Sequence, residues 1–295
     1  MTATETAARS AATRGFGWGN FAAGFVPGLL QFLLGQRVRA AVALASCTLL
    51  FFAGWSMVQD RLFFFSLISA EEPRAPGMMS SIVHLMAQLG MLNLPEMLNL
   101  PANMLGSLMS YEGGSEAERL WRLPRPMENL GGFLTAASGM LAAFWAADGQ
   151  FSLRRQRDGK GQESEPSRNP AMMAGFSWLV PGLGHWMLGQ RDKGLLVGAA
   201  VLLVFGFGLL VSHGHAVDRA IAPVWWIGQL LCGGGTLFAA LVTAPIEMTT
   251  FPEYLDMGTV LCTVGGLMNL VVMIDAFTIA ERTTFPVRAS GSVAK

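Results

Sequence analysis

The stretch VPGLLQFLLGQR at residues 26–37 decides the architecture, because it returns at residues 180–191 as VPGLGHWMLGQR with eight of twelve positions identical. A second set of anchors keeps the same mutual spacing in the two halves of the chain: Gly131, Gly139 and Asp148, then Gly258, Gly266 and Asp275. Self-similarity over a fixed distance indicates a repeated structural unit. A unit of about 125 to 150 residues is too long for a solenoid repeat, so it predicts two tandem halves of one fold.

Charged residues are scarce and segregated in this sequence. Only 14% of the residues are charged and 52% are hydrophobic, whereas about a quarter are charged in an ordinary soluble domain. Five stretches contain no Asp, Glu, Lys or Arg: residues 40–59, 129–147, 194–212, 220–246 and 257–274. A helix of roughly 20 apolar residues spans the ~30 Å hydrocarbon core of a bilayer. The predicted fold class is therefore all-α, a polytopic membrane helical bundle built from two tandem repeats.

The polar stretch between the two halves is rich in charge, Gly and Ser, and it predicts an exposed linker. The predicted organisation is a flexible N-terminal tail (1–15), a first membrane repeat (16–150) with a long extracytoplasmic insert (60–128), a cytoplasmic linker (151–170), a second membrane repeat (171–281) and a C-terminal tail (282–295). Within the insert, residues 91–109 predict short amphipathic helices that lie on the membrane surface or over the bundle.

Each half contains four apolar segments, named A to D in chain order. They cover about residues 16–35, 40–59, 79–94 and 130–149 in the first half, and 171–189, 194–212, 222–245 and 257–280 in the second. The excess of Lys and Arg in the linker and in the C-terminal tail places the linker and both termini in the cytoplasm. An even number of crossings per half follows. The segment lengths favour eight crossings; re-entrant A segments, broken at Pro27-Gly28 and Pro181-Gly182, are the alternative.

The repeated hairpin motif supplies the first candidate site. Its residues are Pro27 and Gly28 in the first copy, and Pro181, Gly182, Gly184, Gly189 and Gly194 in the second. One interpretation is a polar notch walled by His185. The other, which we favour, is a tight hairpin between segments A and B in which His185 bonds to the backbone. The first copy has Gln31 in place of His185, so chemistry at this position is not needed in both halves.

Asp148 and Asp275 form the second candidate site, because each lies near the inner end of a D segment. A lone carboxylate inside a membrane costs about 2.5–3.5 kcal/mol at the helix centre, so such groups face a partner or water. The two carboxylates are either proton or cation sites or members of structural ion pairs, with Arg37 and Arg191 as the predicted partners. Retention of the aspartate in both copies favours the structural interpretation.

Other chemistry has little support in the sequence. His213-Gly-His215, with Asp218 nearby, contains metal-ligand types but no third His or Cys in reach, so no metal site is predicted. The three cysteines lie in apolar runs, and no nucleotide-binding or hydrolase motif is present. The net charge of zero provides no basic field for nucleic acid. No cofactor or catalytic residue is predicted.

The Pro-Gly-x-Gly-His hairpin and the later GLMNLVVMID string (residues 266–275) resemble a bacterial integral-membrane family of unknown function. They are more distantly similar to the two-transmembrane-helix domain with a Gly-x-His hairpin and a later Asp. The resemblance covers about residues 170–280, and the first half resembles a degenerate copy in which Leu30 and Gln31 replace Gly184 and His185. The resemblance implies the architecture and a location in the inner membrane of a bacterium, and it carries no chemistry.

The sequence favours a non-catalytic structural or assembly subunit of a membrane complex. Its expected partners are the lipid bilayer and either another membrane protein or further copies of this chain. A small transporter or channel with a site between the repeats is the alternative. An intramembrane enzyme using His185 and Asp275 is the remote alternative.

Overall fold

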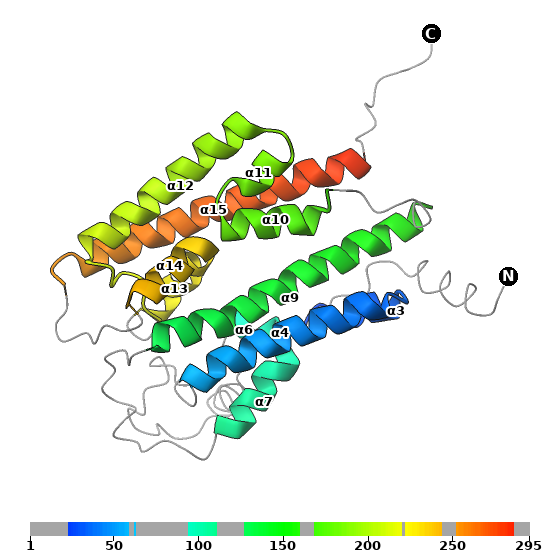
Figure 1. Ribbon diagram of the computed structural model, residues 1–295, viewed down its shortest axis with the longest axis horizontal. Helices are drawn as coiled ribbons and strands as arrows, with labels where there is room; N and C mark the ends of the chain where they lie inside the picture. The colour runs from blue at the N-terminus through cyan, green and yellow to red at the C-terminus, as the bar shows by residue number, and fades with distance from the viewer. Residues whose placement is uncertain are drawn as a thin grey trace, which may run out of the picture.

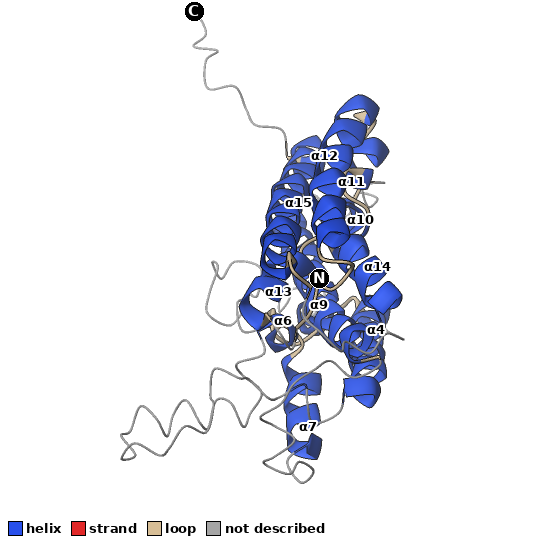
Figure 2. Cartoon of the chain, turned by 90° about the vertical axis from the view of Figure 1, so that its left-hand side faces the viewer, coloured by secondary structure: helices blue, strands red, loops and turns tan. Residues whose placement is uncertain are grey.

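The computed structural model describes residues 23–58, 62, 94–110, 127–159, 168–219, 222–243 and 252–285. Within these residues the regular structure is helical and contains no strand, as Figure 2 shows. The helices are α3 (Leu29–Leu33), α4 (Arg37–Val58), α6 (Leu94–Met97), α7 (Leu100–Ser110), α9 (Glu128–Arg157), α10 (Pro170–Leu179), α11 (Leu183–Met187), α12 (Arg191–Val211), α13 (Pro223–Leu230), α14 (Gly233–Thr243) and α15 (Leu255–Thr284). The predicted N-terminal tail, the first-half C segment up to residue 93 and most of the long insert lie outside the described residues.

Four of these helices are long and apolar enough to cross a membrane: α4, α9, α12 and α15. They coincide with the predicted B and D segments of the two halves. Large apolar side chains on their outer faces are exposed, for example Leu210 at 76% and Val271 at 67%. Exposed apolar surface of this extent fits lipid rather than water as the solvent. The prediction of an all-α membrane protein is therefore confirmed.

The apolar segments A and C of the second half are broken rather than continuous. Segment A forms the ten-residue α10 and the five-residue α11, and a ten-residue helix extends only about 15 Å. Segment C forms α13 and α14, which bend by 117° at their junction. Within the described residues, the second half therefore contains two helices long and apolar enough to span a membrane, or three if the bent pair is one span, and not the four crossings that segment length favoured. Part of the first-half segment A and most of the first-half segment C lie outside the described residues.

The broken segments meet on α15, where one side chain satisfies the backbone groups that the breaks release. Asn269, which is fully buried, donates hydrogen bonds to the carbonyl oxygens of Ser177 (3.1 Å) and Leu231 (2.9 Å). Trp178 donates to the carbonyl oxygen of Leu230 at 2.9 Å. Irregular backbone at membrane depth is tolerated only with such internal partners.

Helix bounds in the first part of the chain match those in the second. The starts of α3 and α4, at Leu29 and Arg37, have the same spacing as the starts of α11 and α12, at Leu183 and Arg191. α9 and α15 have 30 residues each. α7 and α14 both have 11 residues. The order of these matching helices along the chain is the same in both parts.

Helix α9 lies along the boundary between the first-half and second-half helices (Figure 1). It packs against α4 and α6 on one side and against α10 and α14 on the other. Phe133 of α9 shares a buried cluster with Val201 and Phe205 of α12, and its ring stacks on Trp178 with centroids 6.1 Å apart. The hydrophobic core is thus continuous across the boundary. We call this boundary the α9 seam.

Candidate functional site

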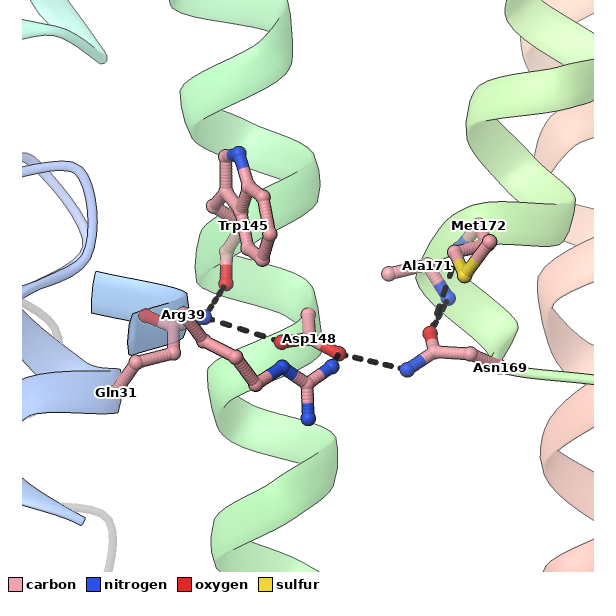
Figure 3. A network of polar contacts seen from close by, with 7 residues as sticks. All are labelled: Gln31, Arg39, Trp145, Asp148, Asn169, Ala171 and Met172. Atoms are coloured by element: carbon pink, nitrogen blue, oxygen red, sulfur yellow. Dashed lines mark hydrogen bonds and ion pairs between the residues drawn. The ribbon is translucent and has the colours of Figure 1, made fainter. Parts of the chain in front are cut away.

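The carboxylate of Asp148 is the centre of a buried polar cluster, shown in Figure 3. Arg39 of α4 pairs with its Oδ1 at 2.9 Å, and Gln31 of α3 donates to its Oδ2 at 3.2 Å. Asn169, which precedes α10, donates to Oδ1 at 2.6 Å. Side chains from three parts of the chain therefore converge on one carboxylate of α9, and we call these residues the Asp148 cluster.

Two members of this cluster also hold backbone groups in place. The Gln31 amide donates to the carbonyl oxygen of Trp145 at 2.6 Å. Asn169 is the N-cap of α10, where its Oδ1 accepts hydrogen bonds from the amides of Ala171 and Met172. An N-cap amide that also binds Asp148 fixes the start of α10 against α9.

A second cluster surrounds Asp275 on α15. Its Oδ2 accepts from Nε2 of His185 at 2.7 Å and pairs with the ammonium group of Lys193. The His185 ring is buried, with 1% of its side chain exposed, whereas the Asp275 side chain is 41% exposed. His185 and Lys193 stand at the motif positions that Gln31 and Arg39 occupy in the first hairpin, so equivalent positions face the two carboxylates. We call these residues the Asp275 cluster.

The arginines predicted to pair with the two carboxylates do not do so. The ion pairs use Arg39 and Lys193, each two residues beyond the predicted Arg37 and Arg191. Residues two apart on a helix point to different faces, and Arg37 and Arg191 are exposed at the starts of α4 and α12. The predicted bond from His185 to the backbone is also replaced, because its Nε2 contacts Asp275.

A double-mutant cycle tests this pairing. We expect Asp148→Asn and Arg39→Gln each to cost about 1–3 kcal/mol, because each removes one charge of an ion pair whose carboxylate is buried. The two changes together should cost less than their sum. Chemical unfolding in detergent micelles measures the free energies. The matched control is Arg37→Gln, which should show no coupling to Asp148→Asn; equal coupling at both arginines would contradict the assignment.

Both clusters lie at one end of the bundle and at the edge of the apolar spans. Asp148 and Asp275 directly follow the charge-free runs 129–147 and 257–274. Of the ten Lys and Arg residues within the described part of the chain, nine lie at this end: Arg37, Arg39, Arg154, Arg155, Arg157, Arg168, Arg191, Lys193 and Arg282. The carboxylates are thus near a membrane interface and not at the centre of the spans.

The motif glycines allow the hairpins to pack tightly. Gly28 and Gly182 have φ values of +81° and +83°, which L residues with side chains rarely adopt. A Cβ on Gly182 would meet the carbonyl oxygen of Gly194 on α12, and a Cβ on Gly184 would meet Met173 and Ser177 of α10. The short helix α11 is therefore held between α10 and α12. This packing places His185 beside α15.

His213 and His215 lie in the turn after α12. The described residues contain no group of three His, Cys, Asp or Glu side chains that could hold a metal ion. Asp218, the third residue of the weak candidate site, accepts a hydrogen bond from Asn129 of α9 at 3.1 Å. Burial, and then the neighbouring His213, lower the pKa of His215 from its ordinary value of 6.5.

This shift predicts a small dependence of stability on pH. The unfolded chain protonates His215 near pH 6.5 and the folded chain only at lower pH, so His215 favours unfolding once the pH falls below about 6.5. We expect the melting temperature to fall less between pH 7.5 and 5.5 in His215→Gln than in the unmodified chain. Thermal melts in detergent at both pH values measure this difference. An identical fall in the two proteins would contradict the assigned shift.

A buried ion pair at the opposite end was not predicted from the sequence. Glu96 of α6 is fully buried, pairs with Arg219 at 2.5 Å and accepts a hydrogen bond from Thr135 of α9 at 2.9 Å. The guanidinium of Arg219 lies 5.0 Å from the Trp226 ring centroid, within cation–π range. The available signal was an acidic residue inside the apolar Leu-Pro-Glu-Met-Leu run at residues 94–98.

The comparisons with known proteins add no activity. No curated protein and no solved structure matches the chain. Residues 172–286, which include α11 to α15 and almost all of α10, are similar to a family of unknown function, DUF6677.

Proposed function

We propose that the chain is a non-catalytic structural or assembly subunit of a membrane complex, built from two copies of one membrane module. The observation that carries this proposal is the α9 seam, where apolar side chains pack across the boundary and polar contacts join the two sets of helices toward both ends of α9. A subunit that organises its neighbours needs a rigid body of this kind.

Four polar contacts cross the α9 seam and join the two sets of helices. Near the start of α9, Asn129 binds Asp218, and Thr135 binds the Glu96–Arg219 pair. Near its end, the Asp148 cluster includes Asn169. The last contact is an ion pair between Arg154 and Glu281 at 2.5 Å. Transport by rocking of one half against the other would have to break contacts at both ends.

The position of the carboxylates also supports a structural role. Transporter sites lie near the bilayer midplane, whereas Asp148 and Asp275 lie at the edge of the spans. Asp148 is 4% exposed, and three protein side chains already bind its two oxygens. Little coordination capacity is left there for an ion.

The proposed duplication rests on matching contacts as well as matching helix lengths. Gly28 packs against the backbone of Ala40 as Gly182 does against Gly194, at equivalent positions of the hairpin motif. On the long helices, Gly54 packs against Gly131 as Gly208 does against Gly258. Gly54 and Gly208 lie at the same position counted from the starts of α4 and α12. Gly131 and Gly258 lie at the same position counted from the starts of α9 and α15.

The concentration of basic residues at the end that carries both clusters supports a cytoplasmic position for that end, by the positive-inside rule. The α3 and α11 hairpins, the linker and both chain ends would then face the cytoplasm of a bacterium from its inner membrane. Four long helices give two crossings per half, which agrees with this orientation.

Two measurements test the structural role. The chain, tagged and expressed at native level, is extracted in mild detergent and its assemblies are weighed by native mass spectrometry. We expect a defined stoichiometric complex with another membrane protein or with further copies. A monomer alone would contradict the proposal.

The second measurement addresses the transport alternative, which the exposed Asp275 side chain and the broken helices favour. Purified protein is reconstituted in liposomes, and proton and Na⁺ flux are followed with dyes. The structural role predicts flux equal to that of empty liposomes. Flux that Asp275→Asn abolishes, with the folded amount unchanged, would replace the structural role by transport.

A further inference from the structure

Each of the two hairpins at the basic end has exposed side chains that take no part in pairing with the carboxylates. Each presents an aromatic, an aliphatic and a guanidinium side chain at equivalent motif positions: Phe32, Leu33 and Arg37 in the first, and Trp186, Met187 and Arg191 in the second. We define these two triplets as the interfacial triads. The apolar members are between 43% and 63% exposed.

We propose that each interfacial triad binds the headgroup of an anionic phospholipid. The apolar pair enters the boundary between headgroups and acyl chains, and the guanidinium binds the lipid phosphate. Aromatic side chains favour this boundary, and a guanidinium forms two parallel hydrogen bonds to phosphate. The headgroup site needs no protein partner, so the test of lipid binding is independent of the test of the subunit role.

Three observations carry the proposal. First, the two arginines lie outside the ion pairs of the carboxylate clusters, which their neighbours Arg39 and Lys193 form. Second, Arg37 precedes the charge-free run of α4 by three residues, which is about 4.5 Å of helix and places it at the headgroup level. The same spacing separates Arg191 from Gly194.

Third, the turn between the members of each triad has a defined backbone conformation, and no other part of the described structure covers it. Gly35 and Gly189 adopt φ values of +79° and +87°, and a Cβ on either glycine would meet nothing within 4 Å. The Arg191 guanidinium carbon lies 5.8 Å from the Trp186 ring centroid, so two members of the second triad already lie together. The triads are thus open toward the membrane interface.

The two triads should differ in their affinity for an anionic lipid. The exposed Asp192 follows Arg191 in the second hairpin, whereas Val38 follows Arg37 in the first. A carboxylate next to the guanidinium weakens the attraction for phosphate. The first triad should therefore contribute more to binding of an anionic lipid, and Asp192→Asn should strengthen the second.

Titration of the delipidated, full-length protein with short-chain phosphatidylglycerol, followed by native mass spectrometry, tests the proposal. We expect Arg37→Ala to weaken binding about fivefold, which corresponds to roughly 1 kcal/mol per arginine near an anionic surface. Arg191→Ala should weaken binding by less, and Asp192→Asn should tighten it. The matched control is Arg282→Ala, at the same end but outside the triads.

Three results would overturn the proposal. An equal loss in Arg282→Ala would reduce the effect to general surface charge. Equal binding of short-chain phosphatidylcholine would remove the role of anionic charge. Competition by free glycerol 3-phosphate at the same concentration would make a soluble phosphate compound, and not a lipid, the ligand.

Discussion

Replacement of Glu96 by Gln is expected to cost about 3–5 kcal/mol of folding free energy, the range found when one partner of a buried ion pair is removed. Glu96 is fully buried, and the Arg219 side chain is only 16% exposed. Without the carboxylate, the guanidinium retains its contact with Trp226 but loses the negative charge of Glu96. We expect a lower melting temperature and a smaller folded fraction in size-exclusion chromatography of the detergent extract.

The double variant Glu96→Gln/Arg219→Gln separates loss of charge balance from loss of packing. It removes both charges from the α9 seam, so it should recover part of the stability that the single variant loses. The control is Glu281→Gln, which removes the carboxylate of an exposed pair with Arg154 and should cost at most about 1 kcal/mol. Equal costs for Glu96→Gln and Glu281→Gln would show that the buried pair does not hold the seam.

The helices that span the membrane could be predicted from the sequence, because absence of charge over about 20 residues is a strong signal. The breaks in segments A and C were harder to predict. Composition is apolar on both sides of each break, and only the Pro181-Gly182 step and the glycines at residues 233–235 mark them. Whether such a step bends a span or ends it depends on partners such as Asn269, which lie far away in the sequence.

The carboxylates of the site could also be predicted, and His185 was already grouped with Asp275, but the basic residues that form the ion pairs could not be predicted. Arg37 and Arg39 are both basic and both lie near the motif, so composition gives no preference between them. The choice depends on where α4 begins, since that register turns Arg39 toward α9 and Arg37 away from it. Glu96 and Arg219 were missed for a similar reason, because they lie 123 residues apart in the sequence and only tertiary packing brings α6 and the segment after α12 together.

Substitution of Gly182 by Ala should cost about 2–5 kcal/mol, because an L residue at φ +83° is strained by roughly 1–2 kcal/mol and overpacking adds about 1–3 kcal/mol. The overpacking arises where the added methyl group would overlap the carbonyl oxygen of Gly194, which forces α11 and α12 apart. The Asp275 cluster would lose its geometry, because both helices supply its partners.

Gly189→Ala isolates the strain from the overlap, since Gly189 has φ +87° but open space where the methyl group would lie. It should cost only the roughly 1–2 kcal/mol of strain. The first hairpin provides an independent pair, with Gly28→Ala expected to be severe and Gly35→Ala mild, because of these two only Gly28 lies against the backbone of another helix. Unfolding free energies of the four variants in one detergent give the comparison. Equal costs within each pair would mean that close approach of the hairpin to the long helix does not stabilise the fold, and the structural basis for two like modules would be lost.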